Sequence, residues 1–351
     1  MQTRRVVAAG LALAARGGGV ATGASPAAAQ AEEEPFPVAG NFVGDAREEV
    51  FTYVPGAGGD QLTSFWRDEL GVISALTTTF RVDGTYWPLA GNFDGDAHDE
   101  IIFYGRGGVP DYVWNFAGSS ATSTPLSVGG GYVPVVGDYT GDGIDDVAWY
   151  GPGADPDHLW TFAADGSHRS TPLAINGYYQ PVSGSFGTDA TDDIFFYGIN
   201  GQGADSLWDF RAGTGGSFRS RPFQVTGAYD PIGIDLWGDG PGGGDILWYA
   251  LGTGPDRVWD WLGGALQPSL DERIDGRYWP IVVGDLFADG SDDVLWFPDD
   301  RTADQPVQGW DHIVFEGDDT LYRSRFTLEP RFWAQGAVVT HESERTVVTR
   351  R

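Results

Sequence analysis

The stretch GNFDGDAHDEIIFY, residues 91–104, recurs in altered form along the chain. The other copies are GNFVGDAREEVFTY from Gly40, GDYTGDGIDDVAWY from Gly137, GSFGTDATDDIFFY from Gly184, IDLWGDGPGGGDILWY from Ile234 and GDLFADGSDDVLWF from Gly284. Their second residues stand at 41, 92, 138, 185, 235 and 285, which gives steps of 51, 46, 47, 50 and 50 residues. Six copies in one register indicate a repeat protein.

Each period holds the pattern of four short strands. A Tyr-x-Pro strand start precedes five of the loops, and an apolar run such as residues 101–104 follows each loop. Four middle repeats then carry Asp-x-x-Trp-x-aromatic, and a short fourth strand such as residues 170–173 ends the unit. This pattern predicts an all-β fold, a β-propeller of six four-stranded repeats. The repeats start near residues 36, 86, 132, 179, 229 and 278.

Residues 332–349 form a degenerate partial seventh copy. Residues 332–336 and 346–348 overlay residues 86–90 and 100–102 without gaps, but the acidic loop between them is lost. This segment forms either a reduced seventh blade or strands that help to close the ring. The sequence leaves six and seven blades as alternatives.

Residues 1–31 have the pattern of an export signal. Arg4 and Arg5 precede an apolar run over residues 6–15, and Ala29-Gln30-Ala31 is typical of a cleavage site. We therefore expect a secreted, extracellular protein with a bacterial-type export signal, by a general or a twin-arginine route. A single β-propeller domain is expected over residues 32–351.

The composition narrows the choice of partners. The 351 residues carry a formal net charge of −29, contain no cysteine, and draw all 21 basic residues from arginine. Nucleic acid and anionic membranes would be repelled, so neither is expected as a partner. No apolar run is long enough to span a bilayer. Without disulfides, stability outside the cell has to come from packing and metal.

The acidic loops have the spacing of a cation site. Counted from the second residue of each copy, side-chain oxygens fall at positions 1, 3, 5 and 9, with a backbone carbonyl at position 7. This alternation points successive oxygens toward one centre, as at the start of an EF-hand loop. Oxygen ligands without cysteine or paired histidine favour calcium over zinc or copper.

These loops resemble the FG-GAP, or VCBS-type, repeats of integrin α-subunit propellers and bacterial exported proteins. The resemblance covers about residues 36–328 and implies calcium in the hairpin loops. Loops two and three are complete. Loops one, four and six lack a side-chain oxygen at position 3 (Val43, Gly187 and Phe287), and loop five (Trp237) also carries a two-residue insertion, so Asx-type turns are the alternative for the depleted loops. The implied ligands are Asn92, Asp94, Asp96, the His98 carbonyl and Glu100; Asp138, Thr140, Asp142, the Ile144 carbonyl and Asp146; and Asp285, Asp289, the Ser291 carbonyl and Asp293.

No motif of an enzyme stands out from the repeat. The chain has no cysteine nucleophile, no G-x-S-x-G, and no histidine pair at metal-ligand spacing. We therefore expect a calcium-binding binding or adhesion module rather than an enzyme, and a monomer. The first alternative is a polysaccharide-active enzyme or an accessory domain on the same scaffold. The second is a structural protein-interaction module with no small ligand.

The ligand of a binding module would be a glycan or a protein. The repeated tryptophans of the third strands, Trp114, Trp160, Trp208 and Trp259, could form a platform for sugar rings. Packing between blades is the competing interpretation of the same residues, and it predicts that their side chains are buried.

Overall fold

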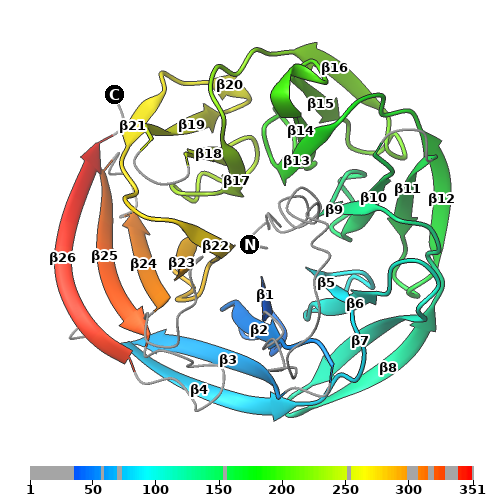
Figure 1. The fold of residues 1–351 in the computed structure, drawn as a ribbon, viewed down its shortest axis with the longest axis horizontal. Coiled ribbons are helices and arrows are strands. Elements are labelled where there is room, and N and C mark those ends of the chain that lie inside the picture. The colour runs from blue at the N-terminus through cyan, green and yellow to red at the C-terminus, as the bar shows by residue number, and fades with distance from the viewer. Residues whose placement is uncertain are drawn as a thin grey trace, which may run out of the picture.

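Six antiparallel sheets surround a central axis in the computed structural model of the chain (Figure 1). The structure describes residues 35–349 except 57–58, 69–72, 153–155, 251–253, 299–306, 315–319 and 329–338. The prediction of an all-β propeller is confirmed, with six blades. The expected export signal, residues 1–31, lies outside the described residues.

Each of the first three blades is one sheet of four consecutive strands, with the first strand nearest the axis (Figure 1). Blade one holds β1 (Phe36–Gly40), β2 (Glu49–Tyr53), β3 (Asp60–Arg67) and β4 (Ile73–Phe80). Blade two holds β5 (Trp87–Gly91), β6 (Glu100–Tyr104), β7 (Asp111–Ala117) and β8 (Ser120–Leu126). Blade three holds β9 (Val133–Gly137), β10 (Asp146–Tyr150), β11 (Asp157–Phe162) and β12 (His168–Leu173).

Blade four repeats this plan, and the last two blades elaborate it. Blade four holds β13 (Tyr179–Gly184), β14 (Asp193–Gly198), the 3-10 turn η1 (Ile199–Gly201), β15 (Ser206–Phe210) and β16 (Phe218–Pro222). Blade five has β17 (Asp230–Ile234), β18 (Asp245–Tyr249) and β19 (Asp256–Leu262), and its outer strand is split into β20 (Ala265–Leu266) and β21 (Leu270–Glu272). Blade six has five strands, β22 (Tyr278–Gly284), β23 (Asp293–Pro298), β24 (Val307–Val314), β25 (Thr320–Leu328) and β26 (Val339–Thr349).

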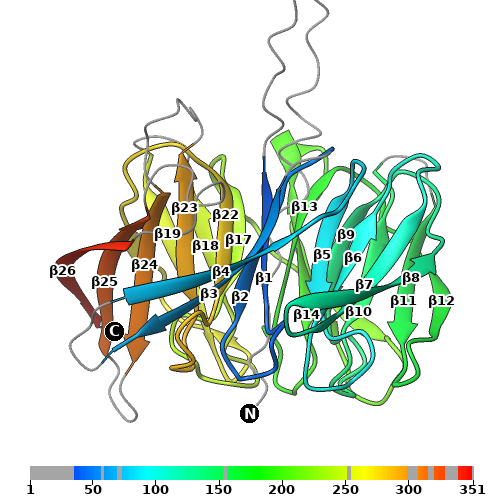
Figure 2. The same ribbon diagram turned by 90° about the horizontal axis from the view of Figure 1, so that it is seen from below.

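The partial seventh copy does not form a blade. Its residues 339–349 make β26, which pairs with β25 as the fifth strand of blade six. Residues 332–338 lie outside the described part of the chain. The ring closes where β1 lies beside β22 and β26 runs beside β4 (Figure 2). We call this contact between blades six and one the seam.

The core consists of apolar layers between adjacent blades. Successive side chains of a strand point to opposite faces, so a second strand packs against both of its neighbours. In β6, Ile101 and Phe103 pack into the cluster shared with blade one, whereas Ile102 and Tyr104 pack into the cluster shared with blade three. This explains why the strands after the acidic loops are apolar without alternation.

A tyrosine hydroxyl links each blade to the next one along the chain. The Tyr104 hydroxyl donates to the carbonyl of Gly130 at 2.9 Å and accepts the N–H of Tyr132 at 2.9 Å. This bond explains the repeated tyrosine at the end of the second strands. The matching residues in the other chain-linked blades are Tyr53, Tyr150, Tyr197 and Tyr249. Blade six has Phe297 at this position.

An aspartate at the start of the third strand is a brace within each of blades one to five. Asp111 accepts the N–H of Gly105 at 2.8 Å with one oxygen and that of Val128 at 2.7 Å with the other. The carboxylate therefore ties the connections on both sides of its strand to one point. The equivalent residues in blades one, three, four and five are Asp60, Asp157, Asp205 and Asp256.

Candidate metal centre

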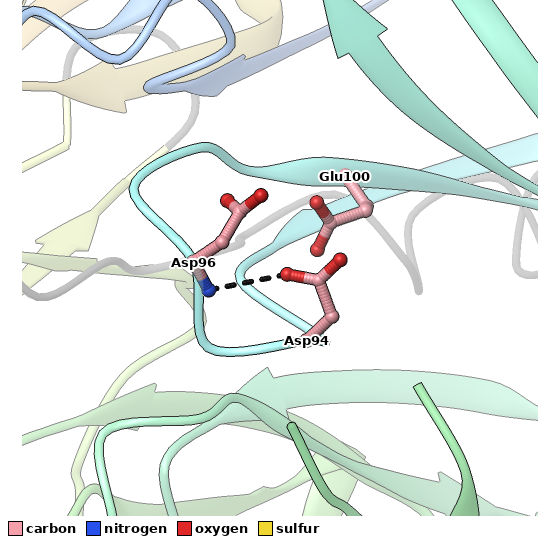
Figure 3. Close-up of side chains that lie close together, drawn as sticks. All are labelled: Asp94, Asp96 and Glu100. Atoms are coloured by element: carbon pink, nitrogen blue, oxygen red, sulfur yellow. Dashed lines mark hydrogen bonds between the residues drawn. The ribbon is translucent and has the colours of Figure 1, made fainter. Parts of the chain in front are cut away.

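Loop two, between β5 and β6, gathers three carboxylates. Oxygens of Asp94, Asp96 and Glu100 all lie within 4.8 Å of one another (Figure 3). Among the described residues, this is the one group of three acids or histidines close enough to share a metal ion. Asp96 is exposed, Asp94 is half-buried and Glu100 is buried, so the group opens to solvent on one side.

Backbone hydrogen bonds of the loop position these acids. The Asn92 side chain accepts the N–H of Gly95 at 2.7 Å, and Asp94 accepts the N–H of Asp96 at 3.1 Å (Figure 3). Asp96 in turn accepts the N–H of His98 at 2.6 Å. Each acceptor sits two or three residues before its donor, which is the local pattern of an Asx turn. Gly95 has a φ of +75° and so allows the tight bend.

Asn115 of β7 is a member of this site that the sequence did not suggest. Its side-chain amide donates to Asp94 at 3.1 Å and to Glu100 at 3.3 Å. The signal was present in the strand register, because Glu100 and Asn115 are direct cross-strand partners. We conclude that the third strand holds the position 3 and position 9 acids together.

Loop three, between β9 and β10, arranges its acids differently. Asp138 accepts the amides of Gly141 at 2.6 Å and Gly143 at 2.9 Å, so its carboxylate serves the loop backbone. Asp142 accepts the N–H of Ile144 at 3.0 Å. Its acids are thus not brought together as in loop two.

Loop three nevertheless contains oxygens that suit a cation. One oxygen of Asp146 accepts the N–H of Phe162 at 3.1 Å, while its other oxygen and the Thr140 hydroxyl are buried without a hydrogen-bond partner. Burial raises the pKa of Asp146 to about 8, and nearby Asp138, Asp142 and Asp145 add to this. Buried polar atoms without partners are costly, and a hard cation would satisfy both. Loops two and three therefore fit calcium.

Loop six, between β22 and β23, differs from them at position 3. Asp285 accepts the amides of Asp289 and Gly290, both at 3.0 Å, and Asp293 accepts the N–H of Leu286 at 2.9 Å. The Ser291 hydroxyl donates to Asp289 at 2.9 Å. At position 3, the ring of Phe287 packs against the core cluster of blades six and one.

The depleted loops use other partners as well. In loop one, between β1 and β2, Asp45 forms an ion pair with Arg47, and the hydrogen bond from Arg47 lowers the pKa of Asp45. In loop four, between β13 and β14, Asp189 accepts the Thr191 hydroxyl and backbone N–H. These contacts satisfy the position 5 acids, whereas at position 9 of loop one an oxygen of Glu49 is buried without a hydrogen-bond partner.

The acids at position 8, which the sequence analysis did not single out, join each loop to the previous one. In loop three, Asp145 donates its N–H to the Asn92 carbonyl at 2.7 Å and accepts the Asn92 N–H at 2.8 Å. Asp192 makes the same pair of bonds with Asp138, at 2.8 and 3.0 Å. Asp99 and Asp292 repeat this clamp on Asn41 and Asp235. The signal was the acidic doublet at positions 8 and 9 in five of the six loops.

The third-strand tryptophans lie in the packing between and within blades. Trp160 is 7% exposed and its ring stacks on His168 at 3.9 Å, and Trp208 is 9% exposed and stacks on Phe218 at 3.9 Å. Trp114 and Trp259 are half-buried among aromatic neighbours. The four residues lie in different blades and are not brought into one surface. Their binding of sugars stays a prediction.

No protein-family model matches the chain, and no curated protein shows significant similarity to it. Within the described residues, no helix has the length and apolar character needed to cross a membrane.

Proposed function

We propose that the chain is a secreted, calcium-binding β-propeller that acts as a binding module. The observation that carries the calcium proposal is the group of Asp94, Asp96 and Glu100, with ligand oxygens within 4.8 Å and Asn115 holding two of them. Three carboxylates this close repel one another, and a divalent cation would relieve that repulsion. The repeat spacing and the overall charge of −29 support the same proposal.

The binding role rests on the rigid frame. The position 8 clamps connect each loop to the neighbouring loop. A cation bound in one loop would therefore stiffen the end of the propeller on which these loops lie side by side. Rigid scaffolds that carry loops are a common basis for recognition. Covered ring faces of Trp160 and Trp208 favour packing for these residues, so the ligand would contact other parts of the face.

Thermal unfolding with excess calcium and with chelator tests the metal proposal. We expect calcium to raise Tm by a few degrees, because it binds the folded chain alone. Asp96→Ala and Asp142→Ala together are expected to abolish the rise, whereas the exposed control Asp165→Ala keeps it. A Tm that does not respond to calcium would show that the loops are metal-free turns.

A glycan array and a pull-down from extracellular proteins, both with calcium, test the binding role. Saturable binding that is lost in the Asp96→Ala/Asp142→Ala variant is the expected result. Turnover of a polysaccharide that the chain binds would instead favour the enzyme alternative.

A further inference from the structure

Arg67 crosses the seam and reaches the acidic loop of blade six. It ends β3 of blade one, and its guanidinium lies 3.0 Å from a carboxylate oxygen of Asp289, which is 222 residues away in sequence. Both side chains are about one-fifth exposed, at 22% and 18%. The same guanidinium lies over the ring of Phe287 at 5.3 Å. Arg67 therefore contacts positions 5 and 3 of loop six at once.

A metal ion would contact these two positions. In loop two they hold Asp94 and Asp96, and in loop three they hold Thr140 and Asp142. In loop six the position 3 residue has no side-chain oxygen, and a fixed positive charge lies beside the position 5 acid. Among the residues that the structure describes, no arginine pairs with Asp94, Asp96 or Asp142.

The strand register shows that this arginine is specific to the seam. Arg67 lies four residues after Thr63, which pairs with Val50 of the second strand. The same register position in blades two to five holds Gly118, Ala164, Ala212 and Gly263.

Ala164 and Ala212 lie beside loops two and three, in the place where Arg67 lies beside loop six. A methyl group on Gly95 of loop two would lie 3.9 Å from Cβ of Ala164, and one on Gly141 of loop three would lie 2.8 Å from Cβ of Ala212. The following blade thus presents alanine to loops two and three, and arginine to loop six.

We propose that Arg67 supplies to loop six the positive charge that calcium supplies to loops two and three, which makes loop six a metal-free, ion-paired latch at the seam. This inference rests on the proposed calcium binding for its contrast with loops two and three, but the latch itself does not require it. It predicts a permanent latch, since arginine stays protonated at every physiological pH. Ion pairs of this exposure weaken in high salt.

Calcium stoichiometry, measured by equilibrium dialysis, tests whether loop six binds metal. We expect Asp289→Asn to leave the number of bound ions unchanged, whereas Asp96→Ala removes one. The double variant Arg67→Ala/Phe287→Asp, which restores an oxygen at position 3, is expected to gain one ion. Loss of an ion in Asp289→Asn, or no gain in the double variant, would overturn the proposal.

Thermal unfolding in chelator tests the latch separately from metal. Arg67→Ala is expected to lower Tm by roughly 2–4 °C at low salt, and less at about 1 M NaCl. Arg273→Ala removes an arginine from an exposed pair with Asp275, at 77% and 58% exposure, and serves as the matched control. Equal Tm values for the two variants would overturn the latch. A chain that binds no calcium would refute the proposed function, while this comparison would still decide the role of Arg67.

Discussion

Five of the six junctions join blades that are consecutive in sequence, whereas the seam joins blades six and one. The two kinds of junction are built from different contacts. At a chain-linked junction such as that of blades two and three, the Tyr104 hydroxyl and the Asp145 clamp act together with the covalent connection. The seam has phenylalanine in place of that tyrosine, at Phe297. It keeps the loop-to-loop backbone bond, from the Glu48 N–H to the Asp285 carbonyl at 2.9 Å. It adds the ion pair of Arg67 and Asp289.

Between blades that are consecutive in sequence, a tyrosine hydroxyl makes the connecting hydrogen bonds. At the seam, where the two blades are far apart in sequence, an ion pair joins them instead. A tyrosine hydroxyl at the end of a second strand reaches the segment that leads into the next blade. Blade six has Phe297 at this place, which carries no hydroxyl, and the ion pair across the seam joins residues 222 positions apart. Variants at the two kinds of junction can therefore be compared directly.

A rise of pH from about 5 to about 8 without metal is expected to have the largest effect, because it ionises buried acids in several loops at once. Burial is the main reason that the pKa of Asp146 and Asp193 is raised to about 8 and that of Asp285 to about 7. A carboxyl group with a raised folded pKa stabilises the fold fully at pH below its unfolded value near 3.8, and this stability is lost as pH rises toward 8.

We therefore expect Tm in chelator to fall steadily between about pH 5 and pH 8. Excess calcium should reduce this slope, because the cation favours the ionised carboxylates. Asp146→Asn should remove part of the slope. A Tm in chelator that rises over this interval would contradict the prediction.

Loss of one position 8 clamp comes next. Asp192→Ala removes the acceptor of the buried Asp138 N–H, and a buried donor without a partner costs about 2–3 kcal/mol. Asp192→Asn keeps an acceptor oxygen at this place and is the matched variant. Urea unfolding should show a clear loss of stability for alanine and a smaller one for asparagine; equal losses would argue against the clamp.

Removal of one tyrosine hydroxyl is expected to cost less. In Tyr150→Phe, the Gly177 carbonyl loses its donor at 2.6 Å and the Tyr179 N–H loses its acceptor at 3.2 Å. We expect about 1–2 kcal/mol of destabilisation in urea unfolding. The reverse change at the seam, Phe297→Tyr, should not stabilise the chain. A gain there would mean that the seam does offer a partner for the hydroxyl.

The smallest effect on stability is expected at Asn115. Asn115→Ala leaves the three carboxylates of loop two in place but removes the amide that holds Asp94 and Glu100. Supporting residues of this kind typically contribute about 10-fold or more to metal affinity. Calorimetric titration should show weaker calcium binding with little change in Tm in chelator. Thr161→Ala, at the same register position of blade three, should leave loop two unaffected.

The fold could be predicted from the sequence because its signals are local and repeated. A step of 46 to 51 residues, the Tyr-x-Pro strand starts and the strands after each loop follow from the order of residues alone. The number of blades could not, since residues 339–349 have the composition of a strand but the sequence does not say which strand they pair with. The structure places them beside β25.

The site could be predicted only in part. Asp94, Asp96 and Glu100 lie within a few residues of one another, so their spacing indicates a common centre. Asn115 and Arg67 belong to strands that meet these loops through tertiary pairing, and one such contact spans 222 residues. The acids at position 8 stand next to the position 9 ligands in the sequence, and only the structure separates the two roles.

Each blade consists of strands that are consecutive in sequence, so among the described strands no sheet combines the beginning and the end of the chain. The ring is therefore closed only by the contacts between blades six and one, in contrast to a propeller whose first and last strands share a sheet. Tension applied through the segments that lead into β1 and out of β26 would bear first on the seam. Arg67 and Asp289 would then set how much force the molecule withstands before it opens into a linear array of blades.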